Sequence, residues 1–133
     1  GFLQNWAVDH RGVTVRLSAE SGPGARIEHR MGDAAANPYT HTAAVLQAAR
    51  LGVANAYKLQ PAETGDCLEN KDATQSVPGT LAGALDALEA DTALTQALGE
   101  GLVANHVGIK RHEIERTAGL EGDALRDHYI RFI

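Results

Sequence analysis

Residues 24–39, GARIEHRMGDAAANPY, decide how this chain is organised. Side chains two residues apart in a β-strand project from the same face of the strand. Arg26, Glu28 and Arg30 therefore share one face of a predicted strand, which is backed by a more apolar face. The ANPY sequence that follows is typical of a helix that starts at a proline. This stretch predicts a strand face with a cation, a carboxylate and a cation in a row, followed at once by a helix.

A second alternating run lies just before this strand. Residues 11–18, RGVTVRLS, place Val13, Val15 and Leu17 on one side of a strand and Arg16 on the other. The intervening AESGPG is rich in turn residues, so the two runs are predicted to form an antiparallel hairpin. If the apolar faces pack together, Arg16 joins the charged row.

The rest of the chain is predicted to be mainly helical. Asn37 is a favourable N-cap for an alanine-rich helix of about five turns, which we expect to be buried. Thr80 and Asp91 are predicted to cap two short helices, and residues 100–119 are predicted to form a longer one. Residues 59–79 contain many turn formers and no clear period, which predicts a long loop.

These elements predict the α+β class, with a short antiparallel hairpin followed by a mostly helical C-terminal bundle. The length of 133 residues favours a single domain. Within it, residues 1–35 would hold the loop and hairpin, and residues 36–133 the helical part. The hydrophobic fraction of 44% and the charged fraction of 22% are typical of soluble globular proteins.

Composition also argues against several classes of partner. A net charge of -5 disfavours a general nucleic-acid binder, although four arginines lie within the first 30 residues. No run approaches the roughly 18 apolar residues of a membrane span, and no signal peptide is visible. The single cysteine, Cys67, predicts no disulfide within the chain and fits a cytoplasmic location. The missing initiator methionine suggests a piece of a longer protein.

The residues alone leave two interpretations of the charged row open. It could be a solvated sheet face, whose ion pairs contribute under about 1 kcal/mol each. It could instead hold a metal-bound phosphate, because a carboxylate binds Mg²⁺ or Mn²⁺ and arginines bind phosphate oxygens. Asp9 and Asp33 could orient the arginines, and His10 could reach a ligand from its loop. His29 is expected to be a packed histidine, and residues 110–116 a solvated helix face with local ion pairs.

Longer motifs resemble a known family. NWAVDHRGVTVR and ARIEHRMGDAAANPY are similar to the "NRxxxxR", "RxExR" and "PDxxANPY" segments near the C-terminal end of glutamine synthetases. PGTLAGALDALEAD resembles "PxSLxEALxALExD" of that family, and IKRHEIER resembles "KxxEIER". The matches run in order along nearly the whole chain. The chain therefore resembles the C-terminal part of a glutamine synthetase catalytic domain.

The resemblance implies roles for matched residues. Glu28 would bind the divalent metal, Mg²⁺ or Mn²⁺, and Arg30 would bind glutamate. Arg11 would stabilise the transferring phosphoryl group, while Arg16 and Arg26 would contact the ATP phosphates. The family forms γ-glutamyl phosphate from glutamate and ATP, and ammonia or another amine then attacks it. It also implies a ring-shaped homo-oligomer for the full-length protein, whose other catalytic segments precede the matched region, so the fragment alone is expected to be inactive.

Three positions depart from the family pattern. His10 stands in place of the usual asparagine, Gly12 in place of serine, and Gly32 in place of proline. The opening NWAVDHR is similar to that of glutamine-synthetase-like γ-glutamyl amine ligases. An organic amine or polyamine is therefore an alternative to ammonia, and a non-catalytic structural relative is a further alternative.

Overall fold

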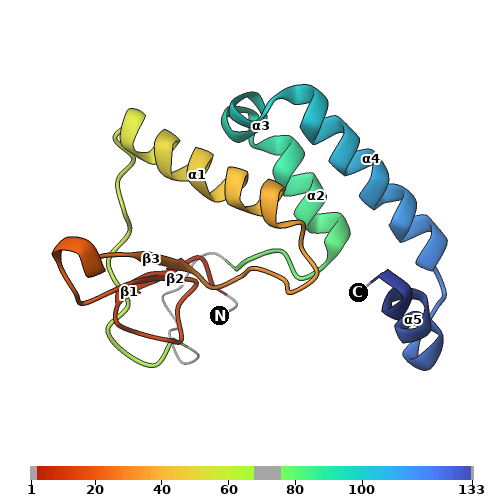
Figure 1. Cartoon of the computed structure of the whole chain (residues 1–133), viewed down its shortest axis with the longest axis horizontal. Helices are drawn as coiled ribbons and strands as arrows, with labels where there is room; N and C mark the ends of the chain where they lie inside the picture. The colour runs from red at the N-terminus through yellow and green to blue at the C-terminus, as the bar shows by residue number, and fades with distance from the viewer. Residues whose placement is uncertain (1–2, 68–75, 133) are drawn as a thin grey trace.

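The computed structural model describes residues 3–67 and 76–132 and has the α+β architecture expected from the sequence. Figure 1 shows a small sheet at one end of the molecule, with α1 (Pro38–Ala54) running above it. The remaining helices extend away from the sheet, and α5 lies at the far end. These helices are α2 (Leu81–Ala90), α3 (Thr92–Leu98), α4 (Glu100–Thr117) and α5 (Gly122–Tyr129), with short 3-10 turns η1 (Gly22–Gly24) and η2 (Ile130–Phe132).

The predicted antiparallel hairpin is confirmed, but its strands are shorter than the alternating runs. Strand β2 (Val15–Leu17) pairs antiparallel with β3 (Ile27–His29), and Arg16 stands opposite Glu28. Opposite residues in such a pair lie on the same face of the sheet, so the charged residues of both strands gather there. Turn η1 lies between the strands, where the sequence predicted turn residues.

A third strand was not predicted. Strand β1 (Trp6–Val8) pairs parallel with β2, in the register Trp6 opposite Val15, which gives the sheet order β1-β2-β3. The chain returns through residues 9–14, and the side chain of Asn5 accepts a hydrogen bond from the backbone N–H of Thr14 at 3.0 Å. Residues 6–8, WAV, form an apolar run that does not alternate with polar residues as the runs around β2 and β3 do, so the sequence carried no periodic signal for this strand.

The predicted helix starts are confirmed by their caps. The side chain of Asn37 accepts hydrogen bonds from the backbone N–H groups of the first turn of α1, with Pro38 at its first position. Thr80 caps α2 and Asp91 caps α3 in the same way. Each cap satisfies a backbone donor that a helix leaves unpaired at its start, which is why these helices begin at these residues.

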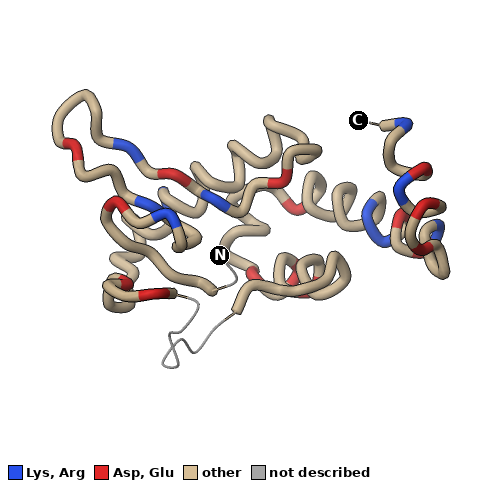
Figure 2. The backbone as a smooth tube through the Cα atoms, turned by 90° about the horizontal axis from the view of Figure 1, so that it is seen from below, with Lys and Arg blue, Asp and Glu red and all other residues tan. Residues whose placement is uncertain are grey.

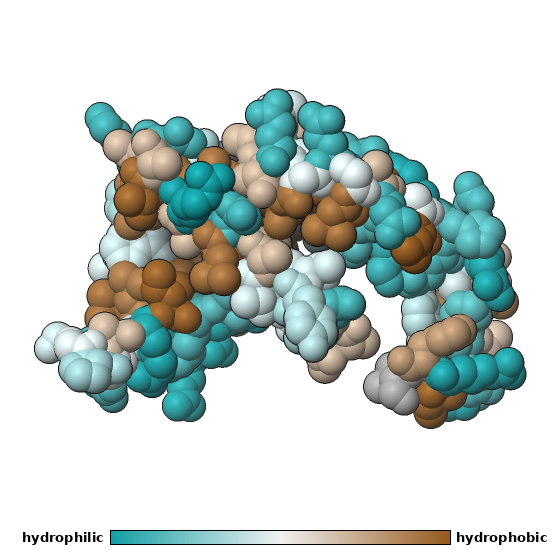
Figure 3. Space-filling view, turned by 45° about the horizontal axis from the view of Figure 1, so that its top comes forward, coloured by the Kyte–Doolittle hydropathy of each residue, from teal (hydrophilic) through white to brown (hydrophobic). Residues whose placement is uncertain are grey.

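The main hydrophobic core lies between α2 and α4. Leu85, Val103 and Val107 are buried there, and the partly buried Leu88, Leu98 and Ile114 pack against them. The prediction that α1 is buried is wrong for this chain. None of its described residues is buried, since α1 contacts α3 along part of its length only and leaves Leu46 64% and Val53 85% exposed. Figure 3 shows apolar residues reaching the surface on this side of the molecule.

Two further features concern the helices. Arg111 on α4 forms ion pairs with Asp86 and Glu89 of α2, so part of the predicted solvated face of α4 joins two helices instead.

Within the described residues, no helix combines the length and apolar character that crossing a membrane requires.

Candidate functional site

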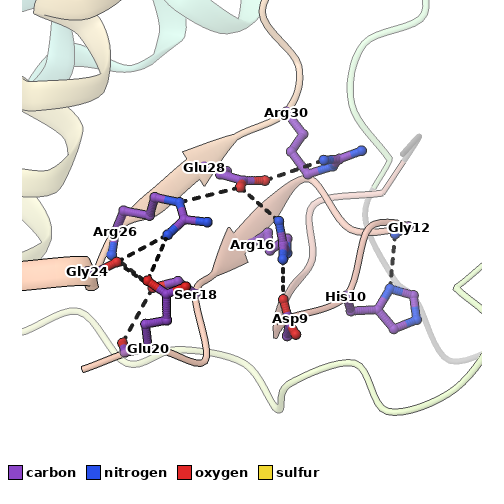
Figure 4. A network of polar contacts seen from close by, with 10 residues as sticks. All are labelled: Asp9, His10, Gly12, Arg16, Ser18, Glu20, Gly24, Arg26, Glu28 and Arg30. Atoms are coloured by element: carbon purple, nitrogen blue, oxygen red, sulfur yellow. Dashed lines mark hydrogen bonds and ion pairs between the residues drawn. The ribbon is translucent and has the colours of Figure 1, made fainter.

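Arg16 occupies the centre of the polar face of the sheet (Figure 4). Its Nη1 donates to Oε1 of Glu28 at 2.8 Å, and its Nη2 donates to Oδ1 of Asp9. Only 13% of the Arg16 side chain is exposed, so this guanidinium is held in one place by two carboxylates. The prediction that Asp9 orients an arginine is therefore confirmed.

Glu28 is surrounded by three of the predicted arginines. Besides Arg16, the Nε of Arg26 lies 3.8 Å from Oε1, and Nη1 of Arg30 lies 3.5 Å from Oε2. Arg26 also pairs with Glu20, which the sequence analysis did not single out, at 3.4 Å. Figure 2 shows acidic and basic residues alternating along this part of the backbone. The prediction from the i, i+2, i+4 spacing, that Arg26, Glu28 and Arg30 lie on a common face, is therefore confirmed.

Arg11 lies outside this network. It is exposed, and none of the ion pairs formed within residues 3–67 and 76–132 includes it. Its charge nevertheless contributes to lowering the pKa of Asp9, after the larger effect of Arg16, so it belongs to the same electrostatic field. The structure therefore brings four of the five predicted site residues into direct contact and places Arg11 at the edge of the group.

The arginines favour the ionised form of two carboxylates, Asp9 and Glu28. The hydrogen bond from Arg16 lowers the pKa of Glu28 below its ordinary value; burial opposes this shift, and the charges of Arg16 and Arg26 add to it. The hydrogen bond from Arg16 likewise lowers the pKa of Asp9. Within the network, three arginines, Arg16, Arg26 and Arg30, are balanced by three carboxylates, Asp9, Glu20 and Glu28. The one excess positive charge belongs to Arg11, outside the network, in a chain whose net charge is -5. That charge favours an anion beside the network.

The described residues do not build a complete metal site by themselves. No group of three or more histidine, cysteine, aspartate or glutamate side chains suited to a metal ion occurs among them. Both carboxylate oxygens of Glu28 are directed at arginines. A single carboxylate also supplies fewer oxygen ligands than Mg²⁺ or Mn²⁺ requires. Within this chain Glu28 supplies a single candidate ligand.

The other candidate residues have different surroundings. Asp33 accepts a hydrogen bond from the backbone N–H of Ala35 at 2.7 Å and forms no ion pair with an arginine among the described residues, so it shapes the turn before α1. His29 contacts the ring of His41 at an angle, with ring centroids 5.3 Å apart, but is exposed, so the prediction of a packed histidine is wrong. His10 has both ring nitrogens near backbone groups and does not extend into open space.

Comparisons with known proteins extend over most of the chain. The family described as "Glutamine synthetase, catalytic domain" matches residues 1–126. The glutamine synthetase of Methanococcus maripaludis is 36% identical over 121 residues, covering 85% of this chain and 27% of that protein. Lengsin of Canis lupus familiaris is 30% identical over 129 residues, covering 96% of this chain and 22% of lengsin.

A solved structure agrees with these sequence matches. A protein described as a novel glutamine synthase homolog superposes with a TM-score of 0.79 and 31% sequence identity. The match covers 97% of this chain and 29% of that protein. The chain therefore spans less than a third of the length of these relatives.

Proposed function

Since the chain belongs to the glutamine synthetase family, with residues 1–126 matching its catalytic domain, we propose that it is the C-terminal part of an ATP-dependent carboxylate–amine ligase. The full-length enzyme would form γ-glutamyl phosphate from glutamate and ATP and transfer the γ-glutamyl group to ammonia. It would work as a ring-shaped homo-oligomer in the cytoplasm. The chain alone would be inactive, because the described residues lack a complete set of metal ligands.

The observation that carries this proposal is the row of arginines around Glu28. Phosphoryl transfer depends on positioning and on neutralising the charge of the phosphate oxygens, and arginine does both through paired hydrogen bonds. The side chains of Arg26 and Arg30 are 50% and 34% exposed, so their free N–H groups can reach an anion. Arg26 would contact the ATP phosphates and Arg30 the glutamate. Arg11, exposed at the edge of the site, would stabilise the transferring phosphoryl group.

Arg16 and Glu28 would work as a unit. Arg16 is expected to contact ATP phosphate, but two of its nitrogens are already bound to Asp9 and Glu28. Its main contribution in this arrangement is to hold Glu28 in a fixed orientation and ionised. Glu28 would supply one carboxylate to a divalent cation, Mg²⁺ or Mn²⁺, whose other ligands come from outside the described residues. That cation, when bound, would neutralise phosphate charge.

The proposal can be tested with the full-length protein that contains this chain. Glu28→Gln preserves the shape of the side chain and removes its charge, so ADP release in the presence of glutamate, ATP and Mg²⁺ should fall below detection. Glu20→Gln is the matched control, since Glu20 also pairs with Arg26 but its side chain is 65% exposed at the end of the hairpin. Unchanged ADP release by Glu28→Gln would refute the site assignment.

The identity of the amine can be settled in the same assay. Turnover with ammonia would establish glutamine synthesis. Turnover only with an organic amine or polyamine would establish the alternative, which the NWAVDHR opening favours. No turnover with any amine would leave a non-catalytic structural relative, although such a relative has no chemical need for three arginines around one glutamate.

A further inference from the structure

The imidazole of His10 is held at both of its nitrogens. Nδ1 accepts a hydrogen bond from the backbone N–H of Gly12 at 3.0 Å, as drawn in Figure 4, and Nε2 lies 3.1 Å from the carbonyl oxygen of Gly65. A carbonyl oxygen can only accept a hydrogen bond, so Nε2 carries the ring proton and Nδ1 is the unprotonated nitrogen. The neutral ring thus joins the turn at residues 10–12 to a segment 55 positions further along the chain.

Gly12 is fixed from its other side as well. The thiol of Cys67, which is only 5% exposed, donates to the carbonyl oxygen of Gly12 at 3.0 Å. A Cβ atom at position 12 would lie 2.5 Å from Sγ of Cys67 and 2.8 Å from Cε1 of His10. Both distances are too short for real contacts, so His10 and Cys67 pack this closely only because residue 12 is glycine. The three residues form one interlocked unit.

Arg11 lies in the sequence between His10 and Gly12, two members of this unit. It forms no ion pair with another described residue, so the backbone on either side sets the position from which its side chain extends. We propose that His10 is a positioning residue for Arg11, holding the 10–12 turn so that the Arg11 guanidinium faces the phosphoryl group. This inference rests on the proposed function of Arg11.

The two ring nitrogens have separable tasks. An asparagine at position 10 can accept a hydrogen bond from the N–H group two residues on, in an Asx turn, and would keep the Gly12 contact. Its side chain is too short to span from there to Gly65 as well. His10→Asn therefore removes the link to Gly65 while preserving the turn, whereas His10→Ala removes both.

The test measures ADP release by the full-length protein carrying His10→Ala, His10→Asn, Arg11→Gln or both His10→Ala and Arg11→Gln. A small misplacement of a catalytic group costs up to ~100-fold in rate, so His10→Ala should lower kcat by ~10- to 100-fold with KM changed less than about threefold. His10→Asn should lose less activity. His10→Ala should have no further effect once Arg11 is replaced, because His10 acts through Arg11. His112→Ala, on the exposed face of α4, is the control and should be unaffected.

Labelling of Cys67 by a thiol reagent, mapped by mass spectrometry, gives a readout that does not depend on activity. Both His10 variants should label faster at Cys67 than the parent, because each loses the link to Gly65. Unchanged labelling, an unchanged kcat in His10→Ala, or an equal loss of kcat in the Arg11→Gln background would each overturn the inference. If Arg11→Gln alone leaves kcat unchanged, the proposed role of Arg11 fails, and the labelling still decides whether His10 forms the bridge.

Discussion

Replacing the buried Leu85 by alanine should destabilise the helical part of the chain more than the truncation of any exposed leucine in it. Leu85 is 2% exposed and is packed between α2 and α4 against Val103 and Val107. The change removes the equivalent of three methylene groups, worth ~0.8 kcal/mol each, or about 2.4 kcal/mol in total. A residual cavity adds to this cost, and Leu→Ala changes in protein cores span about 2–5 kcal/mol.

The surroundings of Leu85 place the expected value near the lower end of that range. The neighbouring Leu88, Leu98 and Ile114 are only partly buried, so they can move into the space that is left. We therefore expect the free energy of unfolding to fall by about 2.5–3.5 kcal/mol. Urea unfolding followed by far-ultraviolet circular dichroism would show a lower midpoint with an unchanged slope.

A matched substitution separates burial from helix propensity. Leu46→Ala makes the same chemical change in α1, where the leucine is 64% exposed, and should cost about 1 kcal/mol or less. If the two variants lose equal stability, or if Leu85→Ala loses less than about 1 kcal/mol, the α2–α4 contact is not the main core and the reasoning is wrong.

Two other predictions follow from local interactions. Asn37→Ala removes the acceptor for two backbone N–H groups at the start of α1 and should lower stability by about 0.5–2 kcal/mol, whereas Asn37→Asp, which retains an acceptor, should restore most of it in a thermal melt. Although His29 is exposed by surface area, partial desolvation of its ring, with a smaller contribution from the charge of His41, lowers the pKa of His29 below its ordinary value. The unfolded chain therefore takes up a proton near pH 6.5 that the folded chain does not, so stability should decrease as the pH falls from about 7.5 to about 5.5. His29→Gln should flatten this dependence and the exposed His112→Gln should not; equal slopes in both would contradict the assignment.

The sequence predicted the grouping of charged side chains better than it predicted the sheet that carries them. The spacing of Arg26, Glu28 and Arg30 fixes their common face through the geometry of a strand alone, which is a local property. To predict that Arg16 lies opposite Glu28, the register of the hairpin was the only further information required. For Asp9, the only sequence signal was its position beside the hairpin. Glu20 could have been predicted as a partner of Arg26 from its position in the turn that precedes Arg26.

Features that depend on contacts between distant segments were not predictable in this way. The residues of β1, which pairs parallel with β2, show no alternation of apolar and polar side chains. The link from His10 to Gly65 spans 55 positions of the chain. The error about α1 has a different cause. Its alanine-rich composition indicates a helix that packs closely against a neighbour, but composition does not say that the neighbour lies within the same 133 residues.

The arrangement of charge on the sheet explains why a carboxylate is needed among so many arginines. The guanidinium groups of Arg16, Arg26 and Arg30 on one small face would repel each other and leave the site without a preferred geometry. Glu28, in contact with all three, offsets part of this repulsion and holds them around one carboxylate. A ligand that brings its own negative charge can then replace Glu28 as partner of the more exposed Arg26 and Arg30, while the less exposed Arg16 stays bound to Asp9 and Glu28. If Glu28 is the cation ligand proposed above, its carboxylate becomes available to the cation only when an anion has taken over Arg26 and Arg30, so binding of the anion and of the cation should be mutually dependent.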